Sequence, residues 1–188
     1  MKAATILHGF SKSKQLAYTA AFAALCCIAT MWLAIPLPAS GFFNTGDVFV
    51  LLAGWCLGPL YGSLAAAVGS ALADVVLGFS VYAPATFIIK GMDALVAYLL
   101  WSALKKVLKK ERLDLLVRAL SAVSAELCMA LGYFLFESLL AGSFAAAIPN
   151  VVGNLLQGGC CCVLAVLLCA SLYHVKRLKT IFPCLYKE

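Results

Sequence analysis

Charged side chains inside apolar runs are the residues of this sequence that could do chemistry. Five acids and one lysine interrupt segments that are otherwise hydrophobic: Asp47, Asp74, Lys90, Asp93, Glu126 and Glu137. An ionised side chain at the centre of a bilayer is unfavourable by at least ~2.5 kcal/mol unless it is paired or hydrated. The positions of these groups along the chain therefore indicate where a charge pair or a pocket lies.

Polar residues recur at helical spacing in three of the apolar segments. Each of these sets marks one face of a helix: Thr86, Lys90 and Asp93; Glu126, Tyr133 and Glu137; Asn150, Asn154 and Gln157. Most of their members fall in the half of the helix that lies on one common side of the membrane. A pocket that opens to water on that side explains the pattern, and its contents suit a small, flat, hydrogen-bonding ligand.

Seven residues are the candidate ligand contacts, chosen by depth and helical face: Asn44, Lys90, Tyr133, Glu137, Asn150, Asn154 and Gln157. Lys90 would offer its ammonium to a hydroxyl or a ring acceptor, while the amides and Glu137 would read ring nitrogens and exocyclic groups. The alternative is purely structural: Lys90 pairs with Asp74 or Asp93, and the amides only bridge helices. Three converging stripes exceed what helix packing requires, which favours the pocket.

The composition requires a membrane environment. Of the 188 residues 64% are hydrophobic and 12% charged, and the mean hydropathy is +1.02. A soluble domain is usually about half apolar and about a quarter charged. Soluble enzymes, nucleic-acid-binding proteins and secreted disulfide scaffolds are therefore excluded. The sequence predicts an all-α integral membrane protein, a compact bundle of six helices in a single transmembrane domain.

The limits of the six helices follow from apolar runs and from proline and glycine. The predicted helices cover about 15–35, 47–57, 61–79, 84–104, 118–140 and 147–173. Pro36 and Pro38 end the first helix, and Pro84 suits the first turn of the fourth. Gly58-Pro59 forces a bend or a tight turn between the second and third.

The basic residues predict the orientation. All Lys and Arg residues except Lys90 fall in three segments: before the first helix, between the fourth and fifth, and after the sixth. An even number of crossings separates these segments, so the positive-inside rule places all three, and both termini, in the cytoplasm. Residues 105–117 alternate basic and aliphatic side chains, which predicts an interfacial helix. Residues 174–188 form a cytoplasmic basic tail.

Small residues mark faces where helix backbones can approach closely. Gly54, Gly58 and Gly62 recur every four residues, which favours packing within the bundle. The first helix carries a wider face, formed by Ala17, Ala20, Ala21 and Ala24. From the sequence alone, this face could serve an inner neighbour or an external partner.

The sequence shows no motif for an energy source, a cofactor or a metal. There is no GxxxxGK[ST] phosphate-binding loop, and the two histidines, His8 and His174, lie at or beyond the ends of the bundle. The nine cysteines lack zinc-site spacing and are predicted to be packing residues. We expect no enzyme activity. A pocket without an energy source suggests a binding subunit that depends on a partner.

Four segments carry a resemblance to a known family. These are GDVFVLLAGWCLGPLYGSLAAAVGSALAD (46–74), YAPATFIIKGMDAL (82–95), ELCMALGYFLFE (126–137) and PNVVGNLLQG (149–158). In this order they resemble the substrate-binding S components of energy-coupling factor (ECF) vitamin transporters. The likeness covers about residues 15–173 and is greatest to the branch with riboflavin-, hydroxymethylpyrimidine- and pyridoxine-type members.

The resemblance implies a specific function and specific partners. It implies a six-helix bundle in a bacterial cell membrane that binds a vitamin near the outer surface, through the first loop and the last three helices. It also implies that either alanine pair of the first helix docks a transmembrane coupling subunit, itself bound to two ATPases, and that the loaded bundle topples to release its ligand inside. One alternative is a stand-alone carrier with Glu126, Asp93 and Asp74 as a proton relay. Another is a membrane scaffold that binds no ligand.

Overall fold

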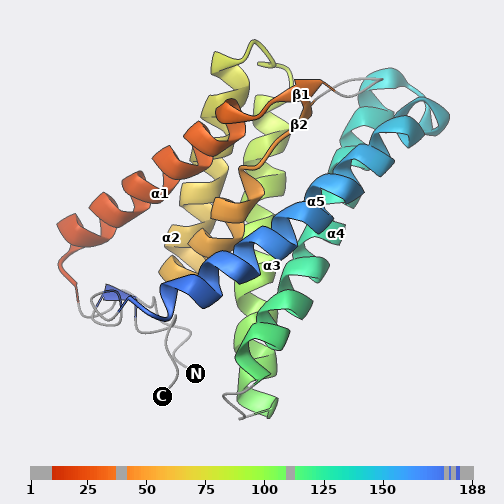
Figure 1. Ribbon diagram of the computed structural model, residues 1–188. Helices are drawn as coiled ribbons and strands as arrows, with labels where there is room; N and C mark the ends of the chain where they lie inside the picture. The colour runs from red at the N-terminus through yellow and green to blue at the C-terminus, as the bar shows by residue number, and fades with distance from the viewer. Residues whose placement is uncertain (1–9, 37–41, 109–112, 176–177, 179–180, 183–188) are drawn as a thin grey trace.

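Long helices account for most of the chain. The computed structural model describes residues 10–36, 42–108, 113–175, 178 and 181–182. In chain order the elements are α1 (Lys12–Trp32), β1 (Ile35–Pro36), β2 (Phe42–Phe43), α2 (Asp47–Val76), α3 (Ala83–Leu108), α4 (Asp114–Ala141) and α5 (Phe144–Leu172) (Figure 1). The two short strands pair antiparallel, Ile35 with Phe43 and Pro36 with Phe42, and form a small ribbon at one end of the bundle.

The helices match a multi-pass membrane protein in length and surface. All five are long and apolar enough to cross a bilayer. Large apolar side chains are exposed along their outer faces, among them Trp32, Leu139 and Val107, which are 86%, 83% and 77% exposed. A surface of this kind is stable against lipid tails and not against water. The predicted all-helical membrane fold is therefore confirmed.

Helix α2 lies at the centre of the bundle. It packs against α1, α3 and α5, while α3 packs on α4 and α4 on α5 (Figure 1). Helices α2 to α5 thus form a closed ring, and α1 lies outside it on α2. In the most apolar 18-residue stretch of α2, 67% of the residues are buried, whereas in the corresponding stretch of α1 only 17% are buried.

A sharp bend at Gly58 divides α2. Gly58 has φ 84° and ψ −173°, a backbone conformation open to glycine but strained for other residues. Pro59 follows and cannot donate the helical hydrogen bond. A Cβ atom on Gly62 would lie 2.4 Å from the carbonyl oxygen of Ala53, although nine residues of straight helix would span about 13.5 Å. The two halves of α2 therefore fold against each other.

This bend changes the predicted helix count. The helices predicted at 47–57 and 61–79 are joined in one element, α2, which ends at Val76 and is interrupted only at Gly58. The described part of the chain therefore has five helical elements where six separate helices were predicted. The breaker itself was placed correctly, and the packing role predicted for Gly62 is confirmed by its contact with Ala53.

The other helices start earlier or end later than predicted, by up to four residues. Helix α1 starts at Lys12 and ends at Trp32, before the prolines, and α3 continues to Leu108. The described ends of the segment predicted as an interfacial helix, 105–117, belong to the two adjoining helices. Residues 105–108 extend α3 and residues 114–117 begin α4, whereas 109–112 lie outside the described residues. Most of the predicted 174–188 tail also lies outside them.

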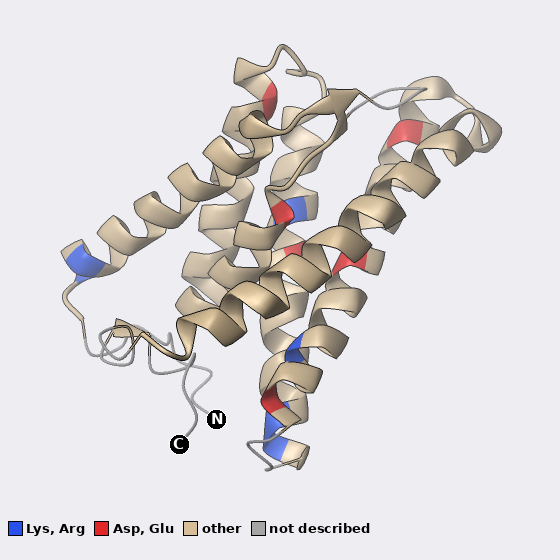
Figure 2. Cartoon of the chain, viewed as in Figure 1, with Lys and Arg blue, Asp and Glu red and all other residues tan. Residues whose placement is uncertain are grey.

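Charged residues divide between the two ends of the bundle. Figure 2 shows Lys and Arg mainly where α1 begins and where α3 ends and α4 begins, away from the β1–β2 ribbon. Most acidic residues lie nearer the end that carries the ribbon (Figure 2). Lys12 and Lys14 lie in the first turn of α1, and Lys105 and Lys106 lie in the last turn of α3.

Candidate functional site

A polar cavity lies at the ribbon end of the bundle. The five helices and strand β2 contribute to its wall: α5 from its first half, and the other elements near the end that faces the ribbon. The lining residues are Thr30, Phe42, Asn44, Ser70, Asp74, Tyr82, Thr86, Lys90, Tyr133, Glu137 and Asn154. The cavity volume is about 30 Å³, which is room for roughly two water molecules. A vitamin-sized ligand requires the wall to move outward.

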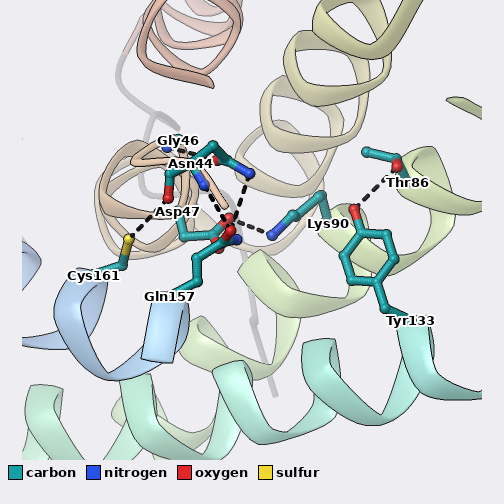
Figure 3. Close-up of polar contacts among 8 residues, drawn as sticks. All are labelled: Asn44, Gly46, Asp47, Thr86, Lys90, Tyr133, Gln157 and Cys161. Carbon is teal, nitrogen blue, oxygen red and sulfur yellow. Dashed lines mark hydrogen bonds and ion pairs between the residues drawn. The ribbon is translucent and has the colours of Figure 1, made fainter. Parts of the chain in front are cut away.

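A buried ion pair forms the floor of the site (Figure 3). The ammonium of Lys90 on α3 donates to Oδ1 of Asp47, at the first turn of α2, and both side chains are 1–3% exposed. The second carboxylate oxygen of Asp47 accepts a hydrogen bond of 2.5 Å from Nε2 of Gln157 on α5. The positive charge of Lys90 is thus matched inside the protein, and three helices are joined at one point.

Gln157 also holds the segment that precedes α2. Its Oε1 accepts hydrogen bonds from the backbone N–H of Asn44 at 2.8 Å and from Nδ2 of Asn44 at 3.3 Å (Figure 3). Oδ1 of Asn44 in turn accepts from the backbone N–H of Gly46 at 2.9 Å. The side-chain amide of Gln157 is therefore engaged with the protein on both sides, and Asn44 is positioned by it in the cavity wall.

Tyr133 lies next to Lys90, on the side of the ammonium that faces away from Asp47 (Figure 3). Nζ of Lys90 lies 5.4 Å from the centre of the Tyr133 ring, close enough for a cation–π interaction. The hydroxyl groups of Tyr133 and Thr86 are 3.0 Å apart and form a hydrogen bond (Figure 3). This pair connects α3 to α4 within the cavity wall.

Several cavity-lining polar atoms have no hydrogen-bond partner among the described residues. They are Oδ2 of Asp74, Oε2 of Glu137, Oγ of Ser70 and Nδ2 of Asn154. All four side chains are at least nine-tenths buried. A buried polar group without a partner is unfavourable by about 1–3 kcal/mol, more if it is charged. These atoms are available to a ligand, and two of them belong to carboxylates.

Aromatic rings line the rim of the cavity. Phe42 of β2 packs on Phe79 with ring centres 4.9 Å apart, and Tyr82 packs on Phe136 at 5.3 Å. Phe79 and Tyr82 are themselves 6.3 Å apart. The four rings connect the ribbon, the α2–α3 turn and α4 around the side of the cavity that faces the ribbon.

Two further acids are buried beside the ion pair without lining the cavity. Asp93 on α3 is 0% exposed and Glu126 on α4 is 4% exposed. None of their four carboxylate oxygens has a hydrogen-bond partner among the described residues. In that part of the chain no group of three or more His, Cys, Asp or Glu side chains is arranged to hold a metal ion.

Comparison with known proteins identifies the family. The profile of the family described as "ECF-type riboflavin transporter, S component" matches residues 10–174. The chain belongs to this S-component family. The matched range includes all five helices.

The S-component assignment agrees with a solved structure. A structure described as "Structure and mechanism of the S component of a bacterial ECF transporter" superposes with a TM-score of 0.62. The two chains are 20% identical, and the match covers 90% of this chain and 99% of the other. At this identity the likeness is one of fold.

A curated protein of Pyrococcus woesei is also similar. It is described as "Uncharacterized protein in gap 3'region" and is 44% identical over 70 residues. The match covers 37% of this S-component chain and 47% of the other protein, so the chain spans about half the length of that relative.

Five of the seven predicted contact residues line the cavity: Asn44, Lys90, Tyr133, Glu137 and Asn154. Gln157 lies behind the wall and holds Asn44 and Asp47. Asn150 is fully buried and hydrogen-bonds the Glu137 carboxylate, so it too lies behind a lining residue.

The sequence reasoning missed the partner of Lys90 and part of the wall. Lys90 pairs with Asp47, not with Asp74 or Asp93 as the alternative reading held. Thr30, Phe42, Ser70 and Tyr82 line the cavity without belonging to any of the polar stripes. The signal available for Asp47 was its place in the first turn of α2, where the helix dipole favours an acid.

The alanine face of α1 points away from the bundle. Ala17, Ala20, Ala21 and Ala24 are all exposed, while Ala23, on another face, lies against Gly69 of α2. The S-component chain therefore packs α1 inward through other residues. The four alanines form a smooth outer surface.

The far end of the bundle contains a second buried charge pair. Nε of Arg118 donates to Asp114 at 2.8 Å, and its guanidinium lies 4.6 Å from the Trp101 ring and 5.3 Å from the Trp55 ring. Tyr173, at the end of α5, donates to the same carboxylate. This cluster joins four helices at the end opposite to the cavity.

Proposed function

We propose that the chain is the membrane-embedded binding subunit of an ECF-type importer, which captures a small water-soluble vitamin or precursor outside the cell. A riboflavin-, hydroxymethylpyrimidine- or pyridoxine-like molecule is the proposed class. One observation carries the proposal: a cavity at one end of an S-component bundle is lined by buried polar atoms that have no partner among the described residues. Binding residues are Asn44, Lys90, Tyr133, Glu137 and Asn154, with Asn150 and Gln157 behind them.

The proposed orientation puts the cavity at the outer surface. The two halves of α2 count as separate crossings, so the chain crosses the membrane six times and both termini are cytoplasmic. The basic residues at the opposite end of the bundle support this orientation through the positive-inside rule. The protein is then a bacterial cell-membrane protein.

The proposed partners are an ECF transmembrane coupling subunit and two ATPase subunits. The exposed face formed by Ala17, Ala20, Ala21 and Ala24 supports docking of the coupling subunit, because small residues allow another helix to approach closely. ATP hydrolysis in the partners then supplies the energy, so the chain itself is not an enzyme and needs no cofactor.

Identification of the bound molecule tests the proposal. The protein is purified in detergent and denatured, and the small molecules released are identified by mass spectrometry. We expect one water-soluble vitamin or precursor, with binding restored when it is added back to washed protein. Asn154→Ala is expected to weaken that binding. Absence of binding by any vitamin, with uptake unchanged by the presence of the protein, contradicts the proposal.

A stand-alone proton-coupled carrier is the second candidate. It is favoured by the buried, unpartnered carboxylates of Asp93 and Glu126, which together with Asp74 could relay protons. Uptake into liposomes that contain only this chain, driven by a pH gradient, would support it. Uptake that requires the ATPase partners and ATP supports the importer.

A further inference from the structure

The wall of the cavity carries two carboxylates, Asp74 and Glu137, that form no salt bridge with a described basic residue. We propose that the ligand is a small organic cation with N–H donors, such as a protonated amine or a cationic amino-heterocycle, held between Asp74 and Glu137. This inference rests on the proposed function, because it names the ligand class of the same cavity.

Lys90 does not supply the missing positive charge. Its ammonium is bound to Asp47, and the pair is almost fully buried. The other oxygen of Asp47 is occupied by Gln157. The pair is neutral as a unit, and a ligand anion would have to displace Asp47 to reach Lys90.

Asp74 and Glu137 face the cavity from two different helices. Asp74 lies near the end of α2 and Glu137 near the end of α4, and each is only 4% exposed. Each has one carboxylate oxygen bonded to the protein, through Thr86 and Asn150 respectively. The other oxygen of each, Oδ2 and Oε2, has no partner among the described residues. N–H groups on a cation would satisfy both oxygens with charge-assisted hydrogen bonds.

Acceptors exceed donors among the unpartnered cavity atoms. An ionised carboxylate can only accept hydrogen bonds, and the hydroxyl of Ser70 can either donate or accept. Among the unpartnered atoms of the described wall, Nδ2 of Asn154 is the one that can only donate. A ligand that matches this set presents more donors than acceptors. Protonated amines and amino-heterocycles have this property.

The aromatic lining also suits a cation. Phe42, Tyr82 and Tyr133 line the same cavity as the two carboxylates. The face of an aromatic ring attracts an organic cation, more strongly when water is excluded. Rings and carboxylates around one small cavity thus act in the same direction.

No other described buried residue offsets the excess. The remaining buried acids beside the ion pair, Asp93 and Glu126, bring no positive charge to the cavity. The second buried cation, Arg118, is paired with Asp114 at the opposite end of the bundle.

Matched pairs of ligands test the charge directly. The full-length protein in detergent is titrated by calorimetry with pyridoxamine and pyridoxine, which share one ring and differ in an ammonium against a hydroxyl group. Thiamine and riboflavin provide a cationic and a neutral heteroaromatic probe. We expect the cationic member of at least one pair to bind roughly 10-fold to 100-fold more tightly, the range for a hydrogen bond to a charged group.

Isosteric variants locate the effect. Glu137→Gln and Asp74→Asn each remove one charge and should remove most of the preference for the cation, with little effect on binding of the neutral probe. Glu126→Gln is the matched control, because Glu126 is on the same helix, is equally buried and does not line the cavity. Monodisperse elution in size-exclusion chromatography shows that each variant is folded. The comparison of cationic and neutral ligands on the unmutated protein tests the inference even if a variant does not fold.

The outcomes separate this inference from the proposed function. Failure of the cationic member to bind more tightly in either pair, or binding of none of the four probes, overturns the inference. If a neutral vitamin is then found with the purified protein, the proposed function stands and only the ligand class is wrong. If no vitamin binds at all, both are wrong.

Discussion

Separating Lys90 from Asp47 should destabilise the protein more than any other single change in the cavity wall. Both side chains are 1–3% exposed, so removal of either leaves a buried charge without its partner. Breaking a buried ion pair from one side is unfavourable by about 3–5 kcal/mol. We expect Lys90→Met to lower the free energy of unfolding by about 4 kcal/mol.

Neutralising the other partner, in Asp47→Asn, should lower the free energy of unfolding by less. In Asp47→Asn the ammonium of Lys90 still has Asp93 and Glu126 nearby, and the new amide oxygen can still accept from Gln157. We expect a loss of about 2–3 kcal/mol. The double variant removes both charges and keeps similar volumes, so it should lie within about 2 kcal/mol of the unmutated protein.

Equilibrium unfolding in mixed micelles measures these differences. The denaturing detergent is titrated and the fluorescence of the three tryptophans is followed. A double-mutant cycle then isolates the energy of the pair from other effects. If the two single losses simply add in the double variant, Lys90 and Asp47 are not coupled and the reasoning is wrong.

Three further changes test other parts of the structure. Gly69→Val should destabilise the protein by about 2 kcal/mol or more in the same unfolding assay, because a Cβ atom there would lie 2.2 Å from the carbonyl oxygen of Ala23 on α1. Gly159→Ala is the control, because a Cβ atom at Gly159 would meet no atom within 4 Å. Arg118→Met removes the buried partner of Asp114 and should lower the free energy of unfolding by about 3–5 kcal/mol. Lys105→Met removes a 43% exposed side chain that lies 3.8 Å from the same Asp114 carboxylate, and it should lower the free energy of unfolding by less than about 1 kcal/mol. Equal losses of stability in the two variants would show that burial does not strengthen the ion pairs of Asp114. Ala21→Leu should leave ligand affinity unchanged but lower ATP-driven uptake with the partner subunits about tenfold, and a loss of ligand affinity instead would place this face inside the bundle.

Periodicity was sufficient to predict the helices and much of the cavity wall. Lys90, Tyr133, Glu137 and Asn154 recur at helical spacing in the half of each helix that faces the same side, and all four line the cavity. Helical spacing reports the face of a helix, and the length of the apolar run reports depth to within a few residues. Those two quantities are enough to place a side chain near a common pocket.

Periodicity could not predict which polar groups satisfy one another. Gln157 lies on the same face as Asn154 but three residues, or about 4.5 Å, further along α5, where it meets Asp47 and Asn44 and not the cavity. The pairing of Lys90 with Asp47 depends on the bend at Gly58, which sets how deep the first half of α2 lies. A local bend angle leaves no trace in a hydropathy pattern.

Outside the helical stripes Asn44 was predicted, but Phe42 and Thr30 were not. Phe42 reaches the cavity because the β1–β2 ribbon places it there, and Thr30 because α1 ends beside the ribbon. The alternating residues 105–108 fit either an interfacial helix or a longer α3, and the continued backbone hydrogen bonds of α3 decided between these.

The position of α1 links the outer alanine face to the cavity mechanically. Helix α1 lies outside the ring formed by the other four, yet Thr30 in its last turns belongs to the cavity wall, and the carbonyl oxygen of Ala29 accepts a hydrogen bond of 3.0 Å from Thr45. Only about 13.5 Å of rigid helix separates Ala21 from Thr30. If filling of the cavity changes the tilt of α1 and thereby the affinity for the proposed coupling subunit, docking of that subunit must change the affinity for the proposed nutrient by the same factor.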